Sequence, residues 1–241
     1  MSVSYLDLSK MIDHSLLNPT LTQDLLEQGV RTAIAYDTAS ICIMPYALRW
    51  CAEELKGTTI KASTTIGFPH GGNSTAVKLA ETRQAIIDGG EELDMVVNIS
   101  RVLSGDWKYV AEDIRTVVSA AHEAQQKVKV IFENCYLNRD QKIRLCEISS
   151  EAGADWVKTS TGYGSSGSTD EDLKLMREHA APQVMVKAAG GIRDLDALLR
   201  VRAIGVSRVG ATATAVILDE FLRREGLPPR SSQAASTPAG Y

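Results

Sequence analysis

The sequence predicts an α/β protein, a single (β/α)8 TIM barrel with a short flexible C-terminal tail, and three observations support this prediction. Strand-like and helix-like segments alternate along almost the whole chain. Glycines such as Gly89-Gly90 and Gly153 follow helix ends, and the next strand begins at once. The 241 residues, 44% of them hydrophobic, suffice for one large core. We expect residues 1–225 to form the barrel and residues 226–241 to form the tail.

The predicted strands are short and distributed along the chain with helical stretches between them. They cover residues 11–14, 40–44, 61–67, 93–98, 128–133, 156–160, 185–188 and 207–209. Eight such strands in a chain of this length favour a closed parallel barrel. An open, doubly wound sheet is the alternative, but its usual Gly-x-Gly-x-x-Gly turn does not follow the first predicted strand.

The stretches between the strands repeat apolar residues at helical intervals. Residues 21–30 and 77–86 each carry such a stripe, and a third consists of Val110, Ile114, Val117, Val118 and Ala121. Ser74 or Thr75 can cap the start of one helix. Thr169 precedes three acidic residues, which suit the positive end of another helix. Each stretch is therefore predicted to be an amphipathic helix.

Charge and composition exclude several classes of function. The net charge is −4 and the basic residues are scattered, which argues against nucleic acid as a partner. No apolar run approaches the length needed to cross a bilayer and no signal-peptide pattern opens the chain, so we expect a cytoplasmic protein. Residues 227–241 are rich in Pro, Ser and Ala and cannot bury enough apolar surface to offset their ordering entropy, which predicts a mobile tail.

The cysteines and histidines give no sign of a disulfide framework or a zinc site. No two cysteines form a Cys-x-x-Cys pair, and the four histidines are far apart in sequence. We expect reduced, mostly buried thiols and no metal or organic cofactor. Cys42 falls in a predicted strand, so it is a candidate for the lining of a site.

Two lysines stand inside short apolar runs, where an unpaired charge is costly to bury. The runs are Asp155-Trp156-Val157-Lys158-Thr159-Ser160-Thr161-Gly162 and Gln183-Val184-Met185-Val186-Lys187-Ala188-Ala189-Gly190-Gly191. A single lysine at a strand end usually extends to the surface. Two of them, about one strand-helix unit apart, indicate an amine that is kept neutral for attack on a carbonyl group.

Asp94 interrupts the apolar run of the fourth predicted strand in the same way. Side chains alternate between the two faces of a strand, so Asp94, Lys158 and Lys187 can all point into the barrel. Charged groups in the barrel layers are costly unless they meet one another, so we expect these three side chains to lie together. The upper end of the barrel, where active sites form, is the expected place.

A second ammonium group can make a lysine reactive at neutral pH. A free lysine has a pKa of about 10.4, so only about one in 2,500 is neutral at pH 7. Making the neutral form common requires a shift of about 3 units, or about 4 to 5 kcal/mol. An ammonium about 5 Å away contributes about 3 kcal/mol at an effective dielectric of about 20. Partial desolvation can contribute the rest, but these arguments leave open which lysine attacks.

Glycine-rich turns follow the last predicted strands. Glycine lets backbone N–H groups approach an anion closely, and a helix N-terminus adds partial positive charge. The loops after strands seven and eight of TIM barrels often hold phosphate. Arg193 either supports such a loop or belongs to a helix start. The turns therefore predict a phosphorylated substrate, held by Thr161, Gly162, Gly190, Gly191, Gly210, Ala211 and Thr212.

Six motifs span almost the whole chain up to the tail. They are Ile12-Asp13-His14-Ser15-Leu16-Leu17, Ile66-Gly67-Phe68-Pro69-His70-Gly71, Glu92-Leu93-Asp94-Met95-Val96-Val97-Asn98, Val157-Lys158-Thr159-Ser160-Thr161-Gly162, Val186-Lys187-Ala188-Ala189-Gly190-Gly191-Ile192-Arg193 and Arg208-Val209-Gly210-Ala211. In this order and combination they resemble the deoxyribose-phosphate aldolases. That family consists of class I aldolases that cleave 2-deoxy-D-ribose 5-phosphate.

The resemblance implies a role for each central residue. Lys158 matches the lysine that forms the Schiff base. Lys187 matches the lysine that tunes its pKa and assists proton transfer, and Asp94 matches the acidic proton carrier. Asp13, in the first motif, and Cys42 are further expected substrate-binding residues.

The chain departs from the family pattern where phosphate binding is expected. The family often has two consecutive serines after the strand-eight glycine and small residue, and here these positions are Thr212 and Ala213. One hydroxyl group is kept and one is lost, while the backbone amides remain. Phosphate binding is therefore expected to persist in weakened form. Ser15 replaces a frequent threonine and keeps its hydroxyl group.

The expected activity is the reversible cleavage of 2-deoxy-D-ribose 5-phosphate to glyceraldehyde 3-phosphate and acetaldehyde. Another Schiff-base aldolase or a transaldolase for a different phosphosugar is the alternative enzyme. A silent phosphosugar-binding protein is the non-enzymatic alternative, but it needs no buried lysine pair. The expected partners are the small phosphosugar, acetaldehyde and a second copy in a homodimer. Tyr241 either folds over the barrel mouth to move a proton or is an untethered terminus.

Overall fold

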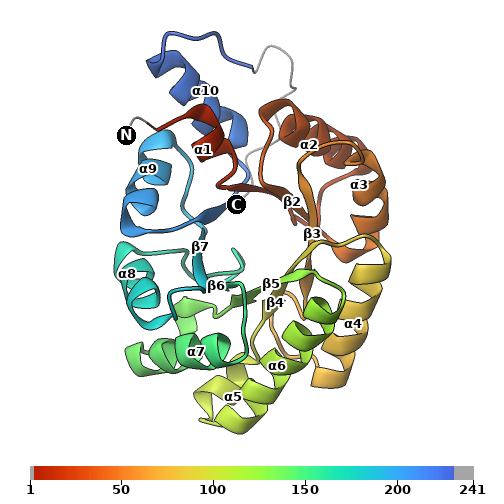
Figure 1. The fold of residues 1–241 in the computed structure, drawn as a ribbon, viewed down its shortest axis with the longest axis vertical. Coiled ribbons are helices and arrows are strands. Elements are labelled where there is room, and N and C mark those ends of the chain that lie inside the picture. Colours follow the sequence, from red (N-terminus) through yellow and green to blue (C-terminus); the bar gives the residue numbers. More distant parts are fainter. Residues whose placement is uncertain (1–2, 231–241) are drawn as a thin grey trace.

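A computed structural model describes residues 3–230 and contains the predicted closed barrel (Figure 1). Its parallel strands neighbour one another in chain order, and the last strand pairs with the first, Ile12 with Val209. The strands are β1 (Ile12–Leu16), β2 (Ser40–Ile43), β3 (Lys61–Ile66), β4 (Glu92–Val96), β5 (Lys127–Ile131), β6 (Trp156–Lys158), β7 (Met185–Ala189) and β8 (Arg208–Ala211). The predicted fold class is confirmed.

The helices form an outer ring around the strands (Figure 1). They are α1 (Tyr5–Ser9), α2 (Gln23–Tyr36), α3 (Leu48–Glu54), α4 (Thr75–Ile87), α5 (Ile99–Leu103), α6 (Trp107–Glu123), α7 (Arg139–Glu151), α8 (Asp170–His179), α9 (Leu195–Ile204) and α10 (Thr214–Arg224), with short 3-10 turns η1 (Pro45–Ala47) and η2 (Asn134–Tyr136). Helix α1 packs beside α10, so the two ends of the described chain meet on the outer surface.

Several strands end earlier than predicted because the chain turns into the loops that build the upper end of the barrel. Strand β4 ends at Val96, and the Asn98 side chain accepts a hydrogen bond from the Arg101 amide, which starts α5. Strand β5 ends at Ile131, and Glu133 already has a left-handed backbone with φ of 57°. Strands β2 to β6 therefore end one or two residues before their predicted ends, whereas β1, β7 and β8 continue one or two residues beyond theirs.

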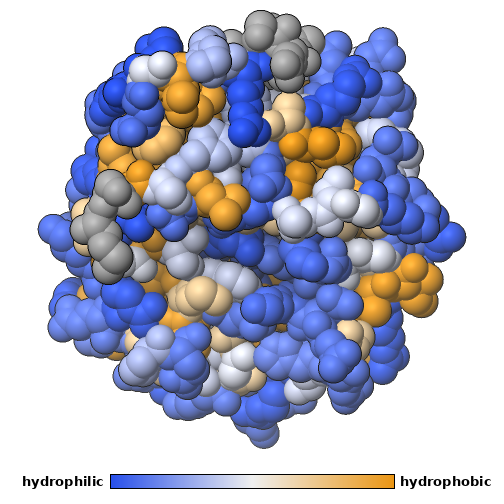
Figure 2. Space-filling view, turned by 45° about the horizontal axis from the view of Figure 1, so that its top comes forward, coloured by the Kyte–Doolittle hydropathy of each residue, from blue (hydrophilic) through white to orange (hydrophobic). Residues whose placement is uncertain are grey.

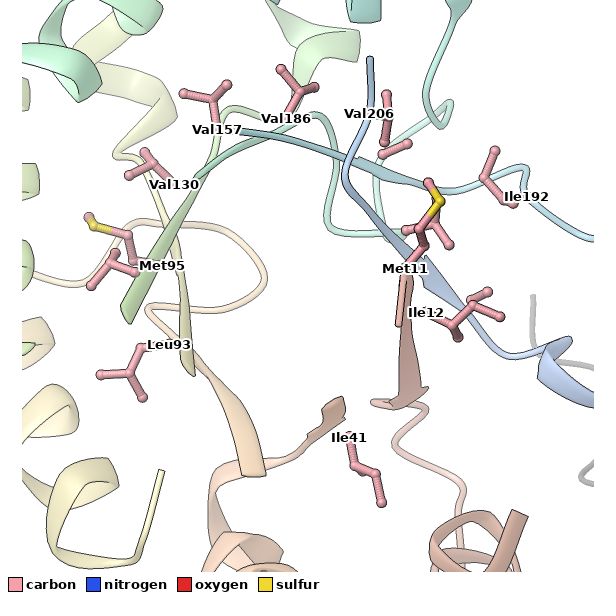
Figure 3. Packing of buried hydrophobic residues seen from close by; sticks show 14 of the residues in the cluster. Met11, Ile12, Ile41, Leu93, Met95, Val130, Val157, Val186, Ile192 and Val206 are labelled. Carbon is pink, nitrogen blue, oxygen red and sulfur yellow. The ribbon is translucent and has the colours of Figure 1, made fainter. Parts of the chain in front are cut away.

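The apolar core lies between the barrel and the helices. Figure 3 shows Leu93, Met95, Val130, Val157 and Val186 pointing outward from their strands, away from the barrel axis. These side chains occupy every second strand position, so the residues between them face the lumen. The outward face is apolar because it packs against helices, and this leaves the lumen available for polar side chains.

The face shown in Figure 2 is mostly hydrophilic, with separate hydrophobic clusters. Among residues 3–230, no helix combines the length and the apolar character that a membrane crossing requires. The expected tail begins within the described chain. Arg230 donates to the Ala35 carbonyl at 2.6 Å and its guanidinium lies over the Tyr5 ring, which places Arg230 against α2 and α1.

Candidate active site

The centre of the barrel lumen holds a carboxylate that two lysines share. Lys158 on β6 and Lys187 on β7 each donate a hydrogen bond to Oδ2 of Asp94, and both distances are 2.7 Å. Asp94 is fully buried, and the two lysines are 3% and 1% exposed. The structure therefore brings together the three side chains to which the sequence assigns the chemistry.

Strand alternation explains why these side chains meet. Asp94 lies between Leu93 and Met95, which point outward into the apolar core (Figure 3). Lys158 follows the outward Val157 in the same way. Lys158 and Lys187 are also direct partners in the pairing of β6 with β7. Their side chains therefore leave neighbouring strands at the same height and reach the same anion.

A third buried lysine, which the sequence argument missed, holds the other oxygen of Asp94. Lys129 on β5 is fully buried and donates to Asp94 Oδ1 at 2.8 Å. Its Nζ also lies 2.7 Å from Glu92 Oε2. The signal was present in the sequence, because Lys129 stands between Val128 and Val130 in an apolar run. Both valines face the core, so alternation sends Lys129 inward.

A second layer of charges lies beneath this centre. The Arg208 guanidinium on β8 donates to both carboxylate oxygens of Glu92, at 2.9 and 2.7 Å, and also to Asp13. The Trp156 ring lies against these cations, 5.1 Å from the Arg208 guanidinium carbon and 5.6 Å from Lys129 Nζ. These side chains lie in the lower lumen, and the upper cavity is the one that Lys158 and Lys187 line.

Asp13 links the two layers and distinguishes Lys187 from Lys158. Its Oδ2 lies 2.6 Å from Lys187 Nζ, so Lys187 faces two carboxylates. Burial by itself lowers the pKa of Lys187, but the charges of Asp13 and Asp94 outweigh it and raise this pKa above its usual value. Lys187 is therefore held as an ammonium ion.

Lys158 behaves in the opposite way. Burial lowers the pKa of Lys158, Asp94 partly opposes this effect, and the positive charge of Lys187 reinforces it. The net shift is downward. The sequence argument gave the neighbouring ammonium the larger share, whereas in the structure desolvation is the largest cause. A Lys158 amine with a lowered pKa next to a fixed ammonium can act as a nucleophile toward a carbonyl carbon.

Asp94 remains ionised despite its complete burial. Desolvation raises its pKa, but the charges of Lys129, Lys158 and Lys187 together hold this pKa well below its usual range. An ionised carboxylate among three amines can accept a proton from one of them or from a bound hydroxyl group. The arrangement therefore provides a nucleophile and a proton acceptor at one place.

A cavity of about 390 Å³ opens above these amines. Its walls come from the loops at the carboxyl ends of the strands. Asp94 lies buried beneath it, and Tyr241 lies outside the described residues. The predicted site residues that line the cavity are Asp13, Cys42, Lys158, Thr161, Gly162, Lys187, Gly190, Gly191, Gly210, Ala211 and Thr212, and Ser15 and Arg193 also reach it.

The cavity wall depends on glycine where two loops approach each other. Gly190 has φ of +78°, and a Cβ atom there would lie 2.7 Å from the Gly167 Cα atom. The Ser168 hydroxyl donates to the Gly190 carbonyl at 3.0 Å and ties the same loops together. Only glycine permits this contact, which leaves the Gly190 and Gly191 backbone along the cavity.

Glu133 is another site residue that the sequence argument did not identify. Its carboxylate accepts hydrogen bonds from the Thr161 amide, at 3.2 Å, and from the Thr161 hydroxyl. The Thr161 hydroxyl oxygen in turn accepts from the Tyr163 amide at 3.0 Å. Glu133 therefore fixes the loop after β6. The left-handed backbone of Glu133, two residues after the end of β5, cannot be predicted from sequence, since it depends on the loop that Glu133 contacts.

Cys42 lines the cavity from β2, opposite the lysines. Burial is the main cause that raises the pKa of its thiol, so it presents an uncharged wall. Within residues 3–230, no group of three or more His, Cys, Asp or Glu side chains is arranged to hold a metal ion.

Comparison with known proteins places the chain in a family. The model of the DeoC/LacD family aldolases matches residues 8–222. The chain is 62% identical over 237 residues to the deoxyribose-phosphate aldolase of Rhodopirellula baltica, covering 98% of each chain. It is 44% identical over 212 residues to the deoxyribose-phosphate aldolase of Clostridium perfringens, covering 88% of this chain and 94% of the relative.

Solved structures agree with the sequence comparison. The deoxyribose phosphate aldolase of Aeropyrum pernix, described as a unique tetramer, superposes with a TM-score of 0.84 at 30% identity, covering 90% of this chain and 92% of the other. An aldolase named QR15 gives a TM-score of 0.86 at 34% identity, covering 91% of this chain and 98% of the other. With its barrel and a family match over nearly all of its described residues, the chain belongs to the DeoC/LacD family of aldolases.

Proposed function

We propose that this aldolase cleaves 2-deoxy-D-ribose 5-phosphate reversibly to D-glyceraldehyde 3-phosphate and acetaldehyde, with Lys158 as the Schiff-base residue. The observation that carries the proposal is the pair of amines around Asp94. Lys158 has a lowered pKa while its neighbour Lys187 has a raised one. The names of the relatives support the choice of substrate.

The reaction begins with the attack of the neutral Lys158 amine on the C1 aldehyde of the open-chain sugar. The carbinolamine loses water and becomes a protonated imine, whose positive nitrogen withdraws electrons from C1 and C2. Lys187, an ammonium ion 2.7 Å from Asp94, donates a proton to the departing hydroxyl group. The buried lumen excludes bulk water and so favours dehydration to the imine.

Carbon–carbon cleavage follows from the imine. A base removes the proton of the C3 hydroxyl group, and the carboxylate Asp94 fills this role through a water molecule that it holds together with Lys187. The C2–C3 bond breaks, C3 becomes the aldehyde carbon of glyceraldehyde 3-phosphate, and the bonding electrons move to the imine nitrogen. The enamine of acetaldehyde remains on Lys158. Protonation at C2 and hydrolysis of the imine release acetaldehyde and restore the free amine.

The phosphate group of the substrate is proposed to bind at the far end of the cavity. Gly190 and Gly191 present their backbone there, and the loop at Gly210, Ala211 and Thr212 leads into the N-terminus of α10. Amide donors and the positive end of a helix favour a dianion. The cavity of about 390 Å³ is large enough for a five-carbon sugar phosphate.

Reductive trapping tests this proposal. Incubation of the protein with acetaldehyde and borohydride should add one ethyl group to Lys158, as read by peptide mass spectrometry. Lys158→Ala should lose both the adduct and turnover of 2-deoxy-D-ribose 5-phosphate. Lys78→Met is the matched control, because Lys78 is also fully buried but lies outside the lumen. An adduct on a lysine other than Lys158 contradicts the assignment.

Product identification separates the proposed reaction from the alternative enzyme. A deoxyribose-phosphate aldolase forms acetaldehyde and glyceraldehyde 3-phosphate from 2-deoxy-D-ribose 5-phosphate. A transaldolase or an aldolase for another phosphosugar would be trapped at Lys158 without forming acetaldehyde from this substrate. Deoxyribonucleotide breakdown, which yields this sugar phosphate, is the proposed pathway.

Three further features belong to the proposal. Tyr241, outside the described residues, is proposed to assist proton transfer at the enamine carbon. Its deletion should then slow deuterium exchange into acetaldehyde, and undiminished exchange contradicts the role. A homodimer is the proposed assembly, and light scattering would distinguish it from the tetramer named for the Aeropyrum pernix relative. Cell fractionation tests the proposed cytoplasmic location, which suits a charged phosphosugar substrate.

A further inference from the structure

We propose that Lys129 is a positioning residue of the active site: it fixes Asp94 and balances the charge of the lumen so that Lys158 is the amine left without a proton. This inference rests on the proposed function, because it concerns the residue to which that function assigns the Schiff base. Lys129 lies below the cavity and is absent from its lining. It therefore acts through Asp94.

The first argument is geometric. Lys129 Nζ lies 2.8 Å from Asp94 Oδ1 and 2.7 Å from Glu92 Oε2. These two carboxylates are two residues apart on β4. Its contact with Oδ1 leaves Oδ2 directed at Lys158 and Lys187. A fully buried ammonium between two carboxylates cannot move without losing both ion pairs. Lys129 thus holds the carboxylate plane in the orientation that both upper lysines use.

The second argument is a charge balance. Among residues 3–230, the ion pairs of the lumen join four basic side chains, Lys129, Lys158, Lys187 and Arg208, to three carboxylates, Asp13, Glu92 and Asp94. One positive charge is in excess when every lysine is protonated. Uncompensated charge is costly in a buried lumen, so the loss of one proton is favoured.

The contacts decide which amine loses the proton. Lys129, Lys187 and Arg208 each face at least two carboxylates. Among the described residues Lys158 forms an ion pair with one carboxylate oxygen, Asp94 Oδ2, and shares it with Lys187. It is therefore the least compensated cation. The directions of the pKa shifts agree: the pKa of Lys158 is lowered, whereas those of Lys129 and Lys187 are raised.

The other groups around Lys158 do not change this balance. Cys42 on β2 faces the lysines as an uncharged thiol, since burial raises its pKa. Glu133 is directed toward the Thr161 loop. Asp13, Glu92 and Arg208 are included in the balance, and the Trp156 ring is neutral. Removing the positive charge at position 129 therefore leaves three basic groups and three carboxylates. These charges balance when Lys158 is protonated, so the pKa of Lys158 should rise.

Lys129→Met tests the inference through the pH dependence of imine formation. The rate at which acetaldehyde and cyanoborohydride modify Lys158 is measured from pH 5 to pH 10 in the full chain. The variant should reach its half-maximal rate about one to two pH units above the wild type. Lys129→Arg keeps the charge and should restore a midpoint close to that of the wild type, even if its longer side chain lowers the maximal rate.

Lys78→Met is the matched control for loss of a buried lysine. Lys78 is fully buried and pairs with Asp113 at 2.5 Å, outside the lumen, between α4 and α6. Its loss destabilises the fold by breaking a buried ion pair, as the loss of Lys129 does, but leaves the charges of the lumen in place. The midpoint of Lys158 modification should therefore stay at the wild-type value. An equal shift in Lys78→Met and Lys129→Met overturns the inference.

Glu92→Gln provides a test of opposite sign that does not depend on the folding of Lys129→Met. Removing this carboxylate adds to the excess of positive charge and strengthens the hold of Lys129 on Asp94. The midpoint for Lys158 should move to lower pH by about one unit. An unchanged or higher midpoint in Glu92→Gln, or an unchanged midpoint in folded Lys129→Met, overturns the inference. Failure of the wild type to be trapped at Lys158 would instead refute the proposed function.

Discussion

Lys158 and Lys187 are direct neighbours on adjacent strands and donate to one carboxylate oxygen at the same distance of 2.7 Å, yet their pKa values shift in opposite directions. Asp13 explains the difference, because among the described residues it forms ion pairs with Lys187, at 2.6 Å, and with Lys129 and Arg208, but not with Lys158. Burial lowers both pKa values, and only Lys187 has enough negative charge around it to reverse the effect.

Replacement of Lys187 should alter the pH at which Lys158 reacts. Lys187→Leu removes an ammonium that lowers the pKa of Lys158 and leaves Asp94 free to favour the protonated form. The midpoint of the pH profile should therefore rise by about one unit or more. Single-turnover trapping of acetaldehyde at Lys158 measures this midpoint. An unchanged profile would mean that like-charge repulsion makes no contribution.

Asp94→Asn should destabilise the protein as well as impair catalysis. The variant leaves three buried lysines with one carboxylate fewer, and breaking such a buried pair costs about 3 to 5 kcal/mol of unfolding free energy. Turnover should fall by a factor of about 10² to 10⁴, because a proton acceptor is lost. Urea denaturation and steady-state kinetics measure the two effects. Glu53→Gln, in an exposed pair with Lys56, should change neither quantity appreciably.

Ala213→Ser should strengthen binding of the phosphate group. Ala213 is the N-cap of α10 and follows the cavity residue Thr212, but it offers no side-chain hydrogen bond. One added hydroxyl donor to a charged phosphate contributes about 1 kcal/mol, or about a fivefold lower KM for 2-deoxy-D-ribose 5-phosphate. The KM for unphosphorylated 2-deoxyribose should stay the same. Equal changes for both substrates would place the phosphate elsewhere.

Stability should decrease between neutral and mildly acidic pH because of His14. This histidine is fully buried on the outer face of β1, its Nδ1 lies 2.8 Å from the Thr214 hydroxyl, and burial lowers its pKa to about 4. In the unfolded chain its pKa is about 6.5, so between these values the unfolded state binds more protons. This group should reduce the unfolding free energy by about 2 kcal/mol from pH 7 to pH 5.

His14→Gln isolates this contribution, since glutamine does not titrate. Chemical denaturation of the variant and the wild type at both pH values gives two differences in unfolding free energy. The decrease should be smaller in the variant by about the contribution of His14, about 2 kcal/mol. Equal decreases would show that His14 is not held neutral in the folded state.

Alternation along single strands was sufficient to identify the central residues. Lys158, Lys187 and Asp94 each interrupt an apolar run, and a parallel barrel packs its outer face against helices, so an isolated polar residue in such a run must face the lumen. The same rule applied to Lys129 would have found the third lysine. The fold, which depends on the order of short local segments, was equally accessible from the sequence.

The partners of these charges were decided only by the closed barrel. Arg208 meets Glu92 across 116 positions of sequence, and Asp13 reaches Lys187 from the other end of the chain. No local sequence pattern predicts these contacts, because they depend on strand register and on closure of β8 onto β1. The sequence by itself therefore determined the barrel, its inward-facing lysines and its glycine loops. The tertiary structure decided which carboxylates each lysine meets, and hence which amine can lose its proton, because Coulomb energies depend on separation in space.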